Sequence, residues 1–278
     1  MFPGEAGARR DRLPARAAYV RVRQVLATAQ KLQGESADAL YVEGLCSYMA
    51  GDWPYAKAAY YRSLELQPRH VHALATYGVM LCTRSRVDEG MALLARAREV
   101  DPLAAFPYAM TGCGLLAARR PQESERYFED ATAFEKENTL VLWGSCMARI
   151  ALGRFGEAIA AAEQGVAVTR RAAFFVGVLG WALGAAGRQD DARTLLEELR
   201  ARPADAPTVV SEAWLLAALG ETDAAFEVLA RAEDERQAFL NYTGFPGFDP
   251  LRGDPRFDAL LQRLGLVPRA AAPARESH

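Results

Sequence analysis

The sequence predicts an all-α fold: a right-handed solenoid of about six helix–turn–helix repeats followed by a C-terminal capping helix. The first observation behind this prediction is a ladder of turn residues. Consecutive members are 34 residues apart from Gly51 to Gly187, and the last step, to Gly220, is 33 residues. The members are Gly51, Ser85, Arg119, Gly153, Gly187 and Gly220. The second observation is that small and aromatic residues recur at fixed positions between these turns. A unit of about this length cannot bury its apolar face alone, so it must stack on copies of itself.

Composition and charge limit the classes of partner. Of the 278 residues, 51% are hydrophobic and 24% are charged, which is ordinary for a soluble globular chain. The formal net charge of −2 gives no electrostatic reason to expect nucleic acid or a membrane as a partner. No stretch approaches the ~20 apolar residues of a membrane span, and the N-terminal residues lack the apolar run of a signal peptide. We therefore expect a cytoplasmic protein.

The unit at 37–70 shows how one repeat is built. Gly44, at its eighth position, lets the first helix approach the second helix closely, and Ala56, at the twentieth, does the same from the other side. Tyr60, at the twenty-fourth position, fills the gap between units. Pro68, at the thirty-second, ends the second helix because proline lacks the backbone N–H and clashes with the preceding turn.

The same positions recur along the chain and divide it into six units. The predicted repeats are 37–70, 71–104, 105–138, 139–172, 173–205 and 206–239. Repeats one, two and five match the pattern best, whereas repeats three, four and six lack the terminal proline. This pattern resembles the tetratricopeptide repeat (TPR) family, and the resemblance implies a scaffold that binds other proteins along its concave face.

The segments outside the repeats have different compositions. Residues 15–36 fall in register with a second helix and are predicted to form a half-repeat or capping helix. The N-terminus, 1–14, and the tail, 267–278, combine glycine, proline, alanine and unpaired charge, so both are predicted to be disordered.

Residues 240–266 are predicted to form a C-terminal capping segment. Its helix opens with Asp254 as N-cap and Pro255 at the first helical position. An apolar stripe at helical spacing then covers the exposed face of the last repeat: Phe257, Leu260, Leu261 and Leu264, closed by Gly265. This end of the chain also resembles TPR regions of bacterial signalling proteins, in which such arrays follow a kinase, an adenylate cyclase or a winged-helix regulator.

Residues with metal-binding or catalytic chemistry are few and scattered. The cysteines fall one per repeat, with no CxxC pair: Cys46, Cys82, Cys113 and Cys146. We interpret them as small packing residues, not as disulfides or metal ligands. His70 and His72 stand at a repeat boundary and are interpreted as turn and surface residues. We find no catalytic motif, and we predict no enzyme activity, no cofactor and no metal site.

The candidate binding surface is the concave wall, which in the resembled family is lined by the first helices. The residues placed there are almost all apolar, and many are aromatic. The candidate partner-binding residues are Tyr41, Tyr48, Phe106, Trp143, Met147, Phe174, Trp181 and Trp214. Two interpretations stay open: these side chains pack as core, or they form an exposed groove for a partner. In an exposed groove, replacing Trp143 or Trp181 by alanine weakens partner binding more than it lowers thermal stability.

The predicted function is therefore a non-catalytic protein–protein interaction scaffold that binds a partner peptide or helix in an apolar concave groove. The alternative is the regulatory or sensory TPR region of a bacterial kinase, cyclase or transcription regulator whose effector domain is absent from this chain. Under either hypothesis the partner is another protein or peptide segment.

Overall fold

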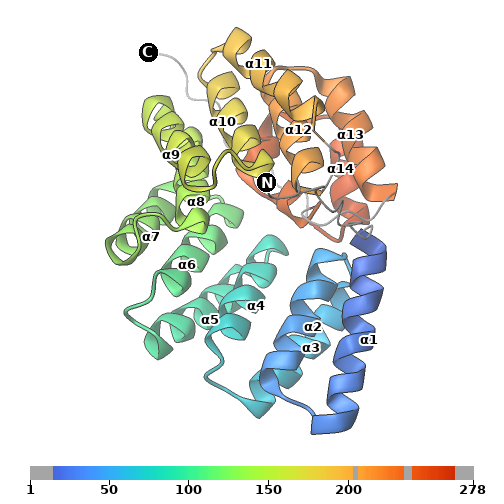
Figure 1. The fold of residues 1–278 in the computed structure, drawn as a ribbon. Coiled ribbons are helices and arrows are strands. Elements are labelled where there is room, and N and C mark those ends of the chain that lie inside the picture. Colours follow the sequence, from blue (N-terminus) through green and yellow to red (C-terminus); the bar gives the residue numbers. More distant parts are fainter. Residues whose placement is uncertain (1–14, 203–205, 235–239, 267–278) are drawn as a thin grey trace, which may run out of the picture.

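The computed structural model describes residues 15–202, 206–234 and 240–266, and all regular secondary structure in these ranges is helical. Six antiparallel helix pairs stack in chain order into a curved array, which confirms the predicted solenoid (Figure 1). The pairs are α2 (Ala37–Met49) with α3 (Trp53–Leu66), α4 (Val71–Thr83) with α5 (Val87–Val100), α6 (Ala105–Ala117) with α7 (Pro121–Phe134), α8 (Thr139–Ala151) with α9 (Phe155–Val168), α10 (Ala173–Ala185) with α11 (Gln189–Arg200), and α12 (Ala206–Ala218) with α13 (Thr222–Asp234).

Helical elements also flank the six pairs. Helix α1 (Ala15–Gln33) precedes them and packs against α2. After α13 come two 3-10 helices, η1 (Leu240–Gly244) and η2 (Pro246–Leu251), and then α14 (Pro255–Arg263). The array curves so far that the C-terminal elements lie next to the first repeat (Figure 1). The predictions of disorder at 1–14 and 267–278 concern residues outside the described part of the chain.

The ladder of turn residues is a ladder of left-handed backbone conformations. All six members have positive φ: 77° at Gly51, 63° at Ser85, 65° at Arg119, 74° at Gly153, 80° at Gly187 and 75° at Gly220. In each turn the next N–H donates to the carbonyl five residues earlier, over 2.8–3.0 Å, as in a Schellman motif. The same turn therefore sets the angle between the two helices of every repeat, and this repetition gives the array its regular curvature.

Replacing Ser85 with glycine is expected to raise the free energy of unfolding by about 1 kcal/mol, because a side chain in the left-handed region is strained. The reverse substitution at the equivalent turn, Gly187→Ser, is expected to lower the free energy of unfolding by a similar amount. Urea denaturation measures the change in the free energy of unfolding for both variants. The same sign of change in both would contradict a conformational origin.

A second repeating feature, an ion pair, follows four of these turns. In four repeats the residue after the ladder position is an arginine that pairs with an acid three residues later: Arg86–Glu89 (2.5 Å), Arg120–Glu123 (2.6 Å), Arg154–Glu157 and Arg188–Asp191 (2.7 Å). Hydrogen bonds from the arginines hold the pKa of Glu89, Glu123 and Glu157 below its ordinary value. An acid in the first turn also complements the helix dipole, so these pairs fix the start of each second helix.

Close contacts between helices explain the small residues at the eighth position. A Cβ atom on Gly44 would lie 3.0 Å from the ring of Tyr60, and one on Gly112 would lie 2.7 Å from the ring of Phe128. Gly144, in the next repeat, faces the same Phe128 ring. The aromatic at the twenty-fourth position thus fills the space between consecutive units, as the sequence predicts.

The predicted capping helix is present as α14. The Asp254 side chain accepts a hydrogen bond from the Arg256 N–H over 2.9 Å, and the apolar stripe faces inward. Ion pairs of 2.8 Å join Arg256 to Asp223 and Arg263 to Glu233, at the two ends of α13. Helix α14 therefore lies along the last repeat and covers its apolar face.

Candidate functional site

The predicted wall residues all lie on the first helices of their repeats. Tyr41 and Tyr48 are on α2, Phe106 on α6, Trp143 and Met147 on α8, Phe174 and Trp181 on α10, and Trp214 on α12. Those on α8, α10 and α12 form one cluster, in which the Phe174 ring lies 6.4 Å from Trp143 and 5.6 Å from Trp214, and Trp181 lies 6.3 Å from Trp214. Tyr41 and Phe106 belong to a separate row, bridged by His72 at 5.7 and 4.7 Å.

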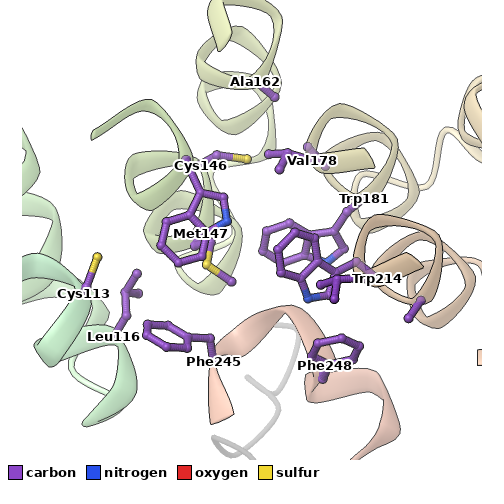
Figure 2. Close-up of a cluster of buried hydrophobic side chains, with 14 of the residues drawn as sticks. Cys113, Leu116, Cys146, Met147, Ala162, Val178, Trp181, Trp214, Phe245 and Phe248 are labelled. Atoms are coloured by element: carbon purple, nitrogen blue, oxygen red, sulfur yellow. The ribbon is translucent and has the colours of Figure 1, made fainter. Parts of the chain in front are cut away.

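A segment of the chain itself covers the larger cluster. Residues 240–251, hereafter the internal segment, lie on the concave wall, and Figure 2 shows Phe245 and Phe248 directed from it toward the wall. The Trp143 ring meets Tyr242 edge-on at 5.1 Å and Phe245 at 5.7 Å. The Trp214 ring lies 6.0 Å from Phe248. As a result Trp143 is only 3% exposed and Trp214 is fully buried.

The backbone of the internal segment approaches the wall most closely at Gly247. A Cβ atom there would lie 2.8 Å from the indole nitrogen of Trp214 and 3.3 Å from the Cε atom of Met147. Gly244, in the same segment, has room for a Cβ, whose nearest neighbour would be Leu266 at 3.8 Å. The position of Gly247 therefore has a steric requirement for glycine that Gly244 does not share.

One ion pair anchors the C-terminal end of the internal segment. Arg119, the third member of the ladder, contacts Asp249 at 2.7 Å and is only 15% exposed. Asp249 also pairs with Arg252 at 2.7 Å. A partly buried, charge-assisted pair of this kind adds geometric specificity to an otherwise apolar contact. It thus fixes the register in which the segment lies on the wall.

The other end of the segment reaches the first repeat. Residues of η1 contact α2, where burial raises the pKa of Tyr48 and the nearby Asn241 side chain acts in the opposite direction. After α14 the chain returns to the same region, where a Cβ atom on Gly265 would lie 3.3 Å from Trp53. The C-terminal residues therefore connect the last repeat to the first across the open side of the array.

The internal segment leaves some polar atoms of this interface without partners. In the described part of the chain, the buried side-chain atoms without a hydrogen-bond partner include the indole nitrogens of Trp143 and Trp214 and Oδ1 of Asn241. Each such group costs on the order of 1–3 kcal/mol. The apolar fit between segment and wall is close, but the polar fit is incomplete.

Five of the eight predicted wall residues are buried, and Tyr41, Phe106 and Phe174 are partly exposed. Burial changes one expectation from the sequence. Trp143 and Trp181 are 3% and 2% exposed, so their truncation is expected to lower stability substantially and not only to weaken binding.

Three cysteines and His70 are buried within the fold. Cys82, Cys113 and Cys146 are buried, and burial raises the pKa of Cys113 and Cys146 to about 12. The surface interpretation was wrong for His70, which is 5% exposed because its ring caps α4, accepting from the Ala73 N–H over 3.2 Å. Its Nε2 lies 3.0 Å from Asp38 of the preceding repeat. No group of three His, Cys, Asp or Glu side chains in the described ranges could hold a metal.

Comparison with known proteins identifies the fold. No protein-family model matches the sequence, and no curated protein matches it. Among solved structures, a TPR protein from Parabacteroides merdae is 12% identical with a TM-score of 0.58, over 90% of this chain and 93% of that one. The type IV pilus biogenesis factor PilW is 20% identical with a TM-score of 0.53, over 71% and 92%. PilF from Pseudomonas aeruginosa is 17% identical with a TM-score of 0.51, over 71% and 90%.

The class that the fold defines is therefore the TPR solenoid, as the repeat pattern predicts. No helix in residues 15–202, 206–234 or 240–266 is both long and apolar enough to cross a lipid bilayer.

Proposed function

We propose that this chain is a non-catalytic protein–protein interaction scaffold that holds a short partner segment on its concave wall. The observation that carries the proposal is the internal segment, which contains no α-helix and places aromatic side chains among the wall tryptophans. A wall that accepts one short segment with aromatic side chains has the shape and chemistry to accept another.

The physical basis of binding is a rigid surface with aromatic anchors. Because the repeats preform the wall, a partner segment meets a surface that needs little further ordering, which lowers the entropic cost of association. Large aromatic contacts in desolvated pockets carry most of the affinity in such interfaces. Arg119 adds a charged group that favours a carboxylate at one end of the bound segment.

A peptide selection tests the proposal. Twelve-residue peptides selected from a random display library against the full chain are expected to bind at the wall, with Kd measured by fluorescence anisotropy. Phe174→Ala, which truncates a partly exposed wall residue, is expected to weaken binding at least tenfold, in the range of an interface anchor. Phe155→Ala, on the outward-facing start of α9, removes the same side chain elsewhere and is expected to leave binding unchanged.

The selection also has results that would reject the scaffold function. One is that no peptide binds, whether or not residues 240–251 lie on the wall. The other is that the selected peptides bind Phe174→Ala and Phe155→Ala equally, which would place their site away from the wall. Thermal unfolding of both variants confirms that the comparison is made between folded proteins.

A further inference from the structure

The internal segment has a regular pattern of recognition groups. Tyr242, Phe245 and Phe248 are spaced three residues apart, and Asp249 follows the last of them. The first two rings meet Trp143, the third meets Trp214, and the carboxylate meets Arg119. Each group of the pattern thus has its own contact on the wall.

We propose that residues 240–251 are an internal ligand, which occupies the site of the partner and is exchanged for it. The partner is a segment of another protein that carries the same pattern: three aromatic residues spaced three apart, glycine before the last, and a carboxylate directly after it. This inference rests on the proposed scaffold function and names the chemistry of its partner.

The contacts of the wall dictate this partner chemistry. The rings of Trp143 and Trp214 lie on different helices and contact different aromatic residues of the internal segment. The space at Gly247 admits no Cβ without movement of Trp214, which requires glycine at that position of any segment bound in this register. Arg119 lies at the end of the path and selects a carboxylate over a neutral side chain.

The incomplete polar fit explains how a partner can displace the internal segment. Neither of the indole N–H groups at Trp143 and Trp214 has an acceptor in the described residues. A partner whose carbonyl oxygens reach these donors gains hydrogen bonds that the internal segment does not make. The internal segment has the advantage of being tethered, with an effective concentration on the order of millimolar. Its occupancy therefore lowers the apparent affinity of a partner for the intact chain.

The experiment uses a fluorescent peptide of residues 240–252 and the full-length chain. Gly247→Val is expected to drive the internal segment off the wall, because the new side chain collides with Trp214 and Met147, while the wall itself is unchanged. This variant is expected to bind the peptide at least tenfold more tightly than the native chain. Gly244→Val, the matched control in the same segment, is expected to bind the peptide within twofold of the native value.

Two further arms test the register of the bound peptide. A peptide that carries the Gly247→Val change itself is expected not to bind, since it meets the same collision. On the Gly247→Val chain, Arg119→Gln and a peptide with Asp249→Asn are each expected to weaken binding about fivefold. Combining the two changes is expected to weaken binding little further, because both remove one ion pair. Additive losses would overturn the assigned register.

A second chain variant, Phe245→Ala with Phe248→Ala, removes the anchors of the internal segment and is also expected to bind the peptide more tightly. The proposal of an internal ligand is overturned when either variant is folded, as shown by cooperative unfolding, but binds the peptide no more tightly than the native chain. It is equally overturned when both variants fail to fold, because residues 240–251 are then indispensable core.

The results separate this inference from the scaffold function. Library peptides that bind the native chain and Gly247→Val equally, and that lack the aromatic spacing, would leave the scaffold function standing and reject the internal ligand. Absence of binding by every peptide to every folded variant would reject both.

Discussion

Replacing Trp214 with alanine is expected to lower the free energy of unfolding by about 3–5 kcal/mol, among the largest losses for a single side chain. Trp214 is fully buried at the point where three parts of the molecule meet. Its ring lies 5.6 Å from Phe174 and 6.3 Å from Trp181 on α10, and 6.0 Å from Phe248 of the internal segment. The substitution therefore opens a cavity between two repeats and removes part of the surface on which the segment lies.

Trp53→Ala is the matched control for this loss. Trp53 is only partly buried, at the start of α3, so its truncation is expected to cost about 1–2 kcal/mol less than that of Trp214. Urea denaturation measures both losses. Hydrogen exchange of the amides in 240–251 is expected to accelerate in Trp214→Ala. Equal losses for the two tryptophans would contradict the placement of Trp214 at a central junction.

Gly90→Ala is expected to lower the free energy of unfolding by about 3 kcal/mol, at the upper end of the range for overpacking. A Cβ atom at this position would lie 2.5 Å from the carbonyl oxygen of Gly78 and 2.5 Å from the Sγ atom of Cys82. A side chain can rotate away from such a contact, but the Gly78 carbonyl belongs to a helix backbone. Helices α4 and α5 must therefore separate to admit a single methyl group.

The same substitution at Gly156 is expected to have the opposite sign. Gly156 is exposed near the start of α9, and no atom lies within 4 Å of a Cβ built there. Alanine is the better helix former, so Gly156→Ala is expected to raise stability by about 0.5 kcal/mol. Thermal and urea unfolding measure both changes, and stabilisation by both substitutions would mean that helix propensity and not contact distance controls the effect.

The repeat architecture could be predicted from the sequence because its signals are local and periodic. Only their distance of 34 residues from their neighbours on the ladder predicts turns at Ser85 and Arg119, and both have the left-handed φ of the glycines. The capping helix was found in the same way, from Asp254, Pro255 and an apolar stripe at helical spacing. Each of these features depends on contacts within one turn or one repeat.

The cover over the wall could not be predicted because it depends on contacts between residues far apart in sequence. Residues 240–251 follow neither α-helical nor strand periodicity, and nothing near Trp143 in the sequence indicates that Tyr242 lies on it. The spacing of Tyr242, Phe245 and Phe248 is the one signal that could have indicated a segment with a wall to bind. His70 was misplaced for a related reason, since its partner Asp38 comes from the preceding repeat.

The contact between Gly265 and Trp53 also limits how this chain can evolve. An open solenoid gains or loses repeats by duplication or deletion of one unit, because each unit meets only its neighbours. Here the residues after α13 reach from the last repeat to the first with a fixed length of chain. An additional repeat would move Trp53 out of reach of Gly265, and a missing one would crowd the internal segment. The length of the C-terminal chain therefore sets the number of repeats that it can span.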